Sequence, residues 1–308
     1  MTATVTLLGP QRQPTVDRVI RALAPSRPVA LITAGWQERE GDDAELVRLV
    51  GGRAVNLHLH ARWLDVLERD AEYAGAEREH RVALEEMRQL YLIRLDHALQ
   101  AAYALARRPG GHPGRTAMAL EDALATIRQV DDTHLRRVAE LRSAFDRAWC
   151  PQEREAVCRH REQVGTVLAG TDCLVVTGGH VGELLHVLHL FDVVGLLPTR
   201  VVAWSAGAMV LTPRVVLFHD RAAHGPAETE VYAGGLARLP DLVVLPHARR
   251  RLRIGDVDRM AILARRFAPA RCLVLDDGVR VDLAAGGALP ASARVVRPDG
   301  RIGEPDAA

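Results

Sequence analysis

Two stretches of this chain alternate short apolar runs with amphipathic segments, and a long segment without strand character separates them. In residues 1–60 and 171–283, runs rich in Val, Leu and Ile alternate with segments whose apolar residues recur at helical spacing. Such alternation is typical of βαβ units, which build a mainly parallel sheet flanked by helices. We therefore expect one α/β core formed by residues 1–61 and 171–308. The expected strands are residues 5–8, 29–33, 54–59, 173–177, 201–204, 215–218, 242–245 and 272–275.

The intervening residues 62–170 are expected to form a helical insertion. Two sets of apolar residues recur there at spacings of three and four, which places each set on one helical face. The Pro- and Gly-rich residues 107–115 cannot continue a helix, so they predict the turn of a long helical hairpin. An unbroken first helix over residues 63–106 would be about 60 Å long. The hairpin is either a structural or dimer-forming arm, with a second copy of the chain as partner, or a lid over a site on the sheet.

Composition excludes several classes of function. All 40 basic residues are Arg, so chemistry that needs a lysine Schiff base or a P-loop lysine is ruled out. The net charge is +1 and acidic residues are interleaved with Arg, which argues against a nucleic-acid partner. The chain begins as a strand without a basic leader, and no stretch reaches 18 uncharged apolar residues, so we expect no membrane partner.

Cysteine and histidine spacing gives no sign of a disulfide scaffold or a metal site. The four Cys form no CxxC pair, and a reduced, cytoplasmic setting is expected. Two pairs of His share a face, His58 with His60 and His186 with His189, but neither pair has a third ligand nearby. We expect no metal and no cofactor.

The most informative motif lies at residues 199–211, where an apolar run ends in Ala-Trp-Ser-Ala-Gly and passes directly into a helix-compatible segment. A strand, a sharp turn and a helix are the context that holds a nucleophile at the edge of a sheet. Ser205 is one of only four Ser and stands at this turn. We predict it to be the nucleophile, with Ala203 and Gly207 kept small because the two arms of the turn approach closely.

A serine nucleophile needs a base and donors for the oxyanion. His247 follows the strand at residues 242–245, and ligands collect at the carboxyl end of such strands, which favours it as the base. The backbone N–H of Ala206 is the first expected oxyanion donor. The second is expected from Gly178 and Gly179, which follow another strand and allow close approach of the backbone.

Together these motifs resemble the S51 serine peptidases, which include peptidase E and the cyanophycinases and have the class I glutamine-amidotransferase-like fold. The resemblance rests on Thr-Gly-Gly at residues 177–179, Trp-Ser-Ala-Gly-Ala at 204–208 and Pro-His at 246–247, and it does not cover the helical insertion. It implies cleavage of a small peptide or amide substrate, with Ser205 as nucleophile, His247 as base, and an oxyanion hole at Gly179 and Ala206.

Several assignments stay open within this resemblance. The acid before the catalytic His of cyanophycinases is replaced here by Leu245 and Pro246, so the triad acid is expected to be Asp220, with Glu228, Glu230 and Asp241 as alternatives. An Arg near the site would hold an acidic substrate group. The residues expected to bind substrate are Arg249, Arg251, Trp36, Trp204 and His180.

Two classes of function therefore remain. The first is a serine hydrolase of a peptide or amide bond. The second is a non-catalytic relative that keeps the turn for packing, binds a small molecule in the cleft and uses the helical arm for assembly; the missing acid before His247 favours it. A glutaminase-type amidotransferase would carry Cys in place of Ser205, and an α/β-hydrolase would have a longer carboxyl-terminal half.

Overall fold

Six strands form the central sheet of the protein. The computed structural model describes residues 4–196, 198, 200–219, 227–283 and 288–305. The sheet has the order β10-β1-β5-β4-β2-β3, and its strands run parallel except β10, which is antiparallel to β1. Residues from both ends of the sequence therefore meet in one mainly parallel sheet. The strands are β1 (Thr4–Leu8), β2 (Val29–Ile32), β3 (Ala54–Asn56), β4 (Cys173–Val176), β5 (Arg200–Trp204) and β10 (Arg280–Leu283).

Both faces of this sheet are covered by helices, as parallel strands require. Alternate residues of the strands enter two different apolar clusters, one on each face. Helices α1 (Val16–Leu23) and α2 (Ala44–Leu49) supply the cluster on one face. The opposite face is covered by α3 (Leu59–Arg69), α6 (Glu155–Ala169), α7 (Val181–Leu190) and α8 (Ala206–Val210). Short 3₁₀ turns, η1 (Ala34–Arg39) and η3 (Val193–Leu196), follow β2 and α7.

Four of the carboxyl-terminal strands lie in a second sheet, whereas the sequence predicts one sheet for the whole core; β10 alone of this group joins the central sheet. This sheet has the order β12-β11-β9-β8, and β8 is parallel to β9. An antiparallel hairpin of β6 and β7 forms a further pair. The apolar run of a strand does not specify its neighbour, and here β8 packs through alternate side chains into the main core and into a smaller cluster beneath α10. The elements are β6 (Arg214–His219), β7 (Ala227–Gly234), β8 (Leu242–Pro246), β9 (Arg271–Leu275), β11 (Val295–Val296), β12 (Ile302–Gly303), α9 (Ala248–Arg251) and α10 (Val257–Phe267).

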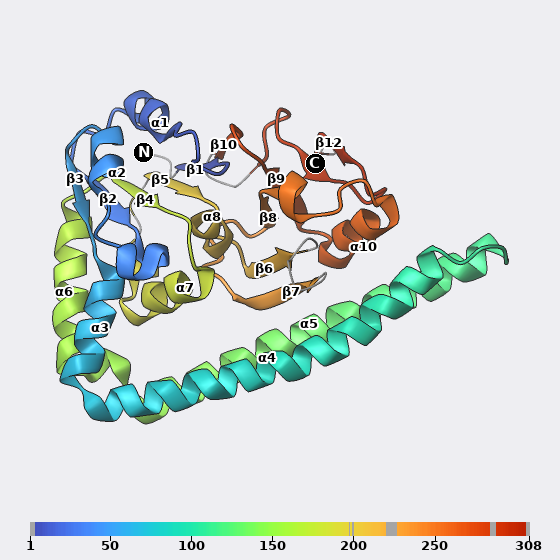
Figure 1. Cartoon of the computed structure of the whole chain (residues 1–308), viewed down its shortest axis with the longest axis horizontal. Helices are drawn as coiled ribbons and strands as arrows, with labels where there is room; N and C mark the ends of the chain where they lie inside the picture. The colour runs from blue at the N-terminus through green and yellow to red at the C-terminus, as the bar shows by residue number, and fades with distance from the viewer. Residues whose placement is uncertain (1–3, 197, 199, 220–226, 284–287, 306–308) are drawn as a thin grey trace.

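The segment between the two halves of the core forms a helical hairpin, which we call the arm, of α4 (Ala71–Ala106) and α5 (Pro113–Trp149). Figure 1 shows the two helices side by side beneath the core, with the turn between them projecting beyond it. The helical stretch predicted over residues 63–106 is interrupted at Asp70, which separates α3 from α4. The Asp70 carboxylate accepts a hydrogen bond from Tyr73 N at 2.9 Å and so caps the new helix. A short turn, η2 (Pro151–Glu153), ends the returning helix.

The arm packs on its own core through apolar and charged contacts. Tyr91, Leu95 and Leu99 of α4 form a buried cluster with residues of α5 and with Ile262 of α10. The inner stripe expected from the sequence is thus buried within the chain. The outer surface keeps several exposed apolar side chains: Val82, Leu90, Ile93 and Met118.

The described helices include none that is both long enough and apolar enough to cross a membrane.

Candidate active site

Ser205 lies in a sharp turn between β5 and α8. Its backbone has φ 50° and ψ −121°, a conformation that non-glycine residues rarely adopt. Gly207 makes this turn possible because a Cβ there would lie 2.3 Å from the carbonyl oxygen of Val176. A Cβ on Gly178 would lie 2.9 Å from Cβ of Ser205. Glycine is therefore needed at Gly178, which follows the neighbouring strand, as well as at Gly207 in the turn itself.

His247 reaches Ser205 from the second sheet. The Nε2 atom of His247 lies 3.5 Å from Oγ of Ser205, although 42 residues separate them in sequence. His247 follows β8 with φ 58°, and its backbone N–H donates to Leu275 O at 3.0 Å, which fixes the ring beside the end of β9. A separation of 3.5 Å is long for a hydrogen bond, but such contacts commonly tighten when substrate binds.

The electrostatic surroundings keep the His247 ring neutral near pH 7. Partial burial is the largest influence and lowers the pKa of His247, and the nearby Arg251 lowers it further. Asp277 and Asp276 oppose this shift without cancelling it. A neutral imidazole with a free nitrogen is the form that accepts a proton from a serine hydroxyl.

Of the three amides expected to hold an oxyanion, those of Gly178 and Ala206 belong to residues beside Ser205, and Gly179 follows Gly178. Gly179 has φ 119°, and a Cβ there would lie 2.0 Å from Gly35 O, so glycine is required. The next amide, at His180, donates to that same oxygen at 2.7 Å and anchors the loop. Within the described part of the chain, the N–H groups of Gly178, Gly179 and Ala206 donate no hydrogen bond. They are therefore available to a substrate oxygen.

The described candidates for the triad acid are paired or placed away from His247. Asp220 lies outside the described residues. Glu228 forms an ion pair with Arg259 at 3.0 Å, and Glu230 forms one with Arg88 at 2.7 Å. Asp241 precedes β8 and so lies at the opposite end of that strand from His247. None of these three carboxylates hydrogen-bonds to the His247 ring, and neither does any other carboxylate in the described ranges.

Two acidic residues near His247 were missed by the sequence reasoning. Asp276 and Asp277 follow β9, which pairs in parallel with β8 and ends beside it. Asp276 accepts a hydrogen bond from Arg249 N at 3.0 Å and lies 3.4 Å from Arg249 Nε. The signal that would have found them is the one used for His247: a polar residue directly after an apolar strand.

The two arginines expected to bind substrate differ in their surroundings. Arg249 is 79% exposed at its side chain and is paired with Asp276. Arg251 is partly buried, and burial lowers its pKa. Among the described residues it makes no ion pair or hydrogen bond through its guanidinium. Arg251 is thus the better placed of the two to bind an anion beside His247.

The remaining residues expected to bind substrate are held by local structure. Trp204 is buried and belongs with Trp36 to the apolar cluster beneath α1 and α2. These two rings therefore support the site from the face of the sheet that α1 and α2 cover. His180 is exposed and caps α7, with Nδ1 accepting a hydrogen bond from Glu183 N at 3.1 Å. Its other ring nitrogen is left for a ligand.

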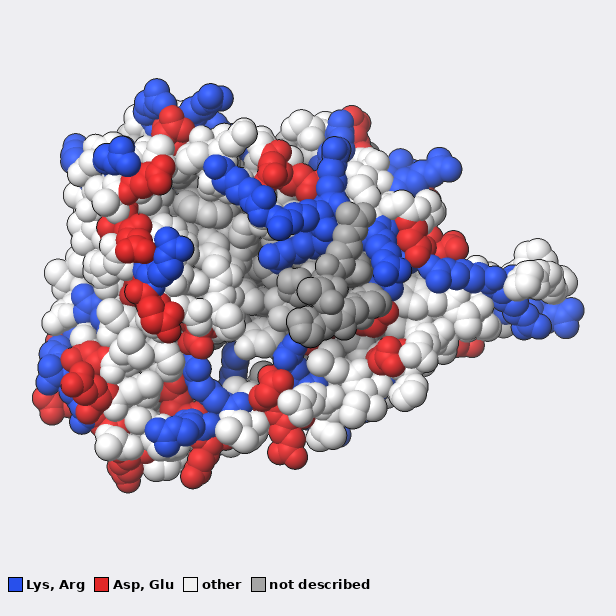
Figure 2. All heavy atoms as spheres, in the orientation of Figure 1, with Lys and Arg blue, Asp and Glu red and all other residues white. Residues whose placement is uncertain are grey.

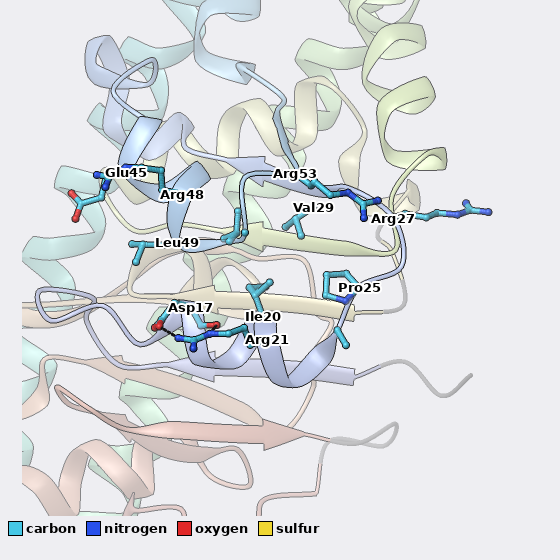
Figure 3. Close-up of a pocket in the computed structure, with 13 residues that line it drawn as sticks. Asp17, Ile20, Arg21, Pro25, Arg27, Val29, Glu45, Arg48, Leu49 and Arg53 are labelled. Atoms are coloured by element: carbon cyan, nitrogen blue, oxygen red, sulfur yellow. Dashed lines mark hydrogen bonds and ion pairs between the residues drawn. The ribbon is translucent and has the colours of Figure 1, made fainter.

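Two hollows of the core differ in their relation to this site. His247 lines a cavity of about 350 Å³ together with Arg12, Asp276 and Asp277. A larger hollow of about 630 Å³ lies at the amino ends of the strands, next to Val29 of β2 (Figure 3). Ligands of open α/β sheets bind at the carboxyl ends of strands, and the first hollow lies at the carboxyl ends of β8 and β9.

The described residues include no group of three or more His, Cys, Asp or Glu side chains that could hold a metal ion.

No family model matches the sequence, and no curated protein matches it. Among solved structures, the chain is similar to a peptidase from an acI-B1 Actinobacterium, with a TM-score of 0.41 and 11% identity over 97% of this chain and 92% of that chain. It is also similar to a "Putative Peptidase E Protein from Listeria monocytogenes EGD-e", with a TM-score of 0.39 and 11% identity over 94% of this chain and 98% of that chain. With TM-scores this low, the function has to be argued from the residues of the site.

Proposed function

We propose that this protein is a serine hydrolase of peptide or amide bonds, similar to the S51 dipeptidases and with a core of the class I glutamine-amidotransferase type. The observation that carries the proposal is the approach of Ser205 Oγ to His247 Nε2 at 3.5 Å. The two residues come from different sheets, and Ser205 has a strained backbone conformation. Strain of this kind persists only where surrounding structure enforces it, and it is concentrated at functional sites.

The geometry supports a two-step acyl transfer. Ser205 Oγ attacks the carbonyl carbon of the substrate while His247 Nε2 takes the hydroxyl proton. The developing oxyanion is bound by the free amides of Ala206 and Gly179. As the carbon–nitrogen bond breaks, His247 returns the proton to the leaving amine. Water then attacks the acyl-enzyme with His247 again as base, and the acid product and free Ser205 are released.

Arg251 is proposed to bind an anionic group of the substrate. It is partly buried near His247 and has no partner among the described carboxylates, so a substrate carboxylate would relieve an unpaired charge. Arg249 is the matched comparison because it follows the same strand and is already paired with Asp276. An Arg251→Gln change is expected to raise KM for acidic substrates far more than Arg249→Gln does.

The proposal is tested by replacing Ser205 and by labelling it. Ser205→Ala should abolish hydrolysis of a dipeptide library and block labelling by a fluorophosphonate, while leaving the far-UV circular dichroism unchanged. Ser143→Ala is the control because Ser143 is an exposed residue of the arm. Failure of the wild-type protein both to react with the fluorophosphonate and to cleave any library member would refute the proposal.

The alternative is a non-catalytic relative that binds a small molecule in the cleft and assembles through the arm. It is favoured by one observation, that no carboxylate within the described ranges orients the His247 ring. Asp220→Asn discriminates between the two functions. In a hydrolase whose triad acid is Asp220, kcat should fall by about 10⁴-fold, whereas a binding protein has no turnover to lose. The exposed apolar residues of the arm are the surface proposed for a second copy of the chain.

A further inference from the structure

A cavity of about 1040 Å³ lies between the arm and the core, apart from the Ser205 and His247 pair. Its walls come from α4, α5, α7 and the end of β7. Figure 2 shows the surface hollowed between the core and the arm on this side of the molecule. Its lining includes His180, which directly follows Gly179 in the chain. Its volume is that of a site for a small organic molecule.

Most of the arginines that line this cavity are already neutralised. Arg81 forms an ion pair with Glu183 at 2.8 Å, and Arg88 forms one with Glu230 at 2.7 Å. Both pairs join α4 to the core, so they hold the arm in place. These guanidinium groups are therefore committed to structural contacts and are poor candidates for binding a ligand.

Arg142 of α5 is different. It lines the cavity and is partly buried, yet it makes no hydrogen bond and no ion pair with any residue in the described ranges. Burial lowers its pKa, and the nearby Asp146 carboxylate opposes the shift only in part. The Arg142 guanidinium therefore has no counter-ion within the described structure, and an anion in the cavity would gain a charge-assisted hydrogen bond there.

Two further polar groups of the cavity lack partners within the described structure. The Tyr232 hydroxyl makes no hydrogen bond there, and its raised pKa keeps it protonated, so it can donate to an anion. A Cβ on Gly182 would lie 2.5 Å from this hydroxyl oxygen, so glycine leaves room for it. The His80 ring stacks on Phe145 with centroids 4.4 Å apart, and its pKa is lowered by burial and by Arg142. His80 is therefore a neutral hydrogen-bonding group.

Acidic and apolar residues that line the cavity limit the charge and shape of a ligand. Glu77 is buried in the cavity wall, where it accepts a hydrogen bond from Trp63 Nε1 at 2.9 Å and lies 3.2 Å from His186 Nε2. Asp146 also lines the cavity, has no ion pair within the described structure and would repel a multiply charged anion, whereas Glu85 is paired with Arg88 at 3.2 Å. Apolar and aromatic side chains make up the remaining surface: Tyr73, Leu84, Leu135, Val138, Phe145 and Leu190.

We propose that this cavity is a second binding site, for a small organic monocarboxylate with an apolar body. The carboxylate is held by Arg142 and the Tyr232 hydroxyl, and the apolar body packs against Phe145 and its apolar neighbours. Inorganic phosphate and other strongly charged anions are excluded by the acidic residues of the wall. The site lies on the arm, so it is distinct from the proposed substrate position beside Arg251.

The test measures binding to the full-length protein by isothermal titration calorimetry near neutral pH. Phenylacetate and hexanoate are the probes, phenylacetamide is the neutral comparison, and phosphate is the inorganic one. We expect saturable binding of the two carboxylates to the wild-type protein and to Ser205→Ala, with at least tenfold weaker binding of the amide. Arg142→Met should weaken carboxylate binding by about tenfold or more, because it removes a charge-assisted hydrogen bond.

Two controls separate binding from folding. Arg147→Met removes an exposed arginine of the same helix that is not among the residues lining the cavity, and it should leave carboxylate binding unchanged. Arg142→Met should unfold at the same temperature as the wild-type protein or higher, because it removes an unpaired, partly buried charge. The proposal is overturned if neither carboxylate binds at millimolar concentration, if phosphate binds as well as they do, or if Arg142→Met binds them as the wild type does.

Discussion

Asp131 of α5 and Arg266 of α10 form a buried ion pair that joins the arm to the core, and Asp131→Asn would break it. Each side chain is 1% exposed. The Asp131 carboxylate accepts hydrogen bonds from Arg266 Nε at 2.7 Å, from Arg266 Nη2 at 2.6 Å and from Tyr91 Oη at 2.8 Å. An Asn in its place keeps the shape but loses the charge and turns one acceptor into a donor.

Asp131→Asn lowers the free energy of unfolding because it leaves Arg266 buried without a charged partner. Arg266 would keep its charge at a position that is 1% exposed, and removing one partner of a buried pair destabilises a protein by about 3–5 kcal/mol. The double variant Asp131→Leu with Arg266→Met should recover most of this loss, because replacing both charges by apolar groups is often neutral. A residual cost of about 1–3 kcal/mol is expected because Thr229 O loses the hydrogen bond that it accepts from Arg266 Nη1 at 2.7 Å.

The assay is urea unfolding followed by circular dichroism, with hydrogen exchange as the local measurement. Exchange should accelerate along α4 and α5 in Asp131→Asn before the central sheet is affected, because the pair holds the arm. Glu140→Gln is the control: its partner Arg136 lies on the same helix, and the two side chains are 61% and 62% exposed. That change should cost at most about 0.5 kcal/mol. A loss below about 1 kcal/mol for Asp131→Asn would show that the pair does not anchor the arm.

Further predictions concern the site and its glycines. We expect kcat/KM to rise with pH through the pKa of His247. Burial and Arg251 both lower that pKa, so the midpoint of the rise should lie below pH 6.5 and should move upward in Arg251→Gln. Gly207→Ala should lower the free energy of unfolding by about 1–3 kcal/mol or more, because its Cβ would lie 2.3 Å from Val176 O. Gly75→Ala, in helix α4 with no atom within 4 Å of the new Cβ, should instead stabilise the protein by about 0.5–1 kcal/mol, as urea unfolding would measure. Equal changes in the free energy of unfolding for Gly207→Ala and Gly75→Ala, or a midpoint of the kcat/KM profile above pH 6.5, would contradict these predictions.

Local patterns in the sequence predicted eight of the described strands and the turn at Ser205. These strands follow from short-range periodicity, and the turn follows from Ala-Trp-Ser-Ala-Gly because small residues are needed at its two arms. The strands β7, β10, β11 and β12 were missed. The hairpin of α4 and α5 follows from the Pro- and Gly-rich turn at residues 107–115. The interruption at Asp70 was missed because a single capping residue in a helical pattern is a weak signal.

Contacts between distant residues were decided by the tertiary structure. Periodicity does not specify strand partners, so the division of the core into two main sheets, and the meeting of His247 with Asp276 across β8 and β9, could not be read from the chain. The pairing of Asp131 with Arg266 and the unpaired state of Arg142 depend in the same way on how the arm lies against the core. The sequence does not show whether a charged residue is solvated, paired or buried alone. The free energy of that residue depends on neighbours that only the folded chain supplies.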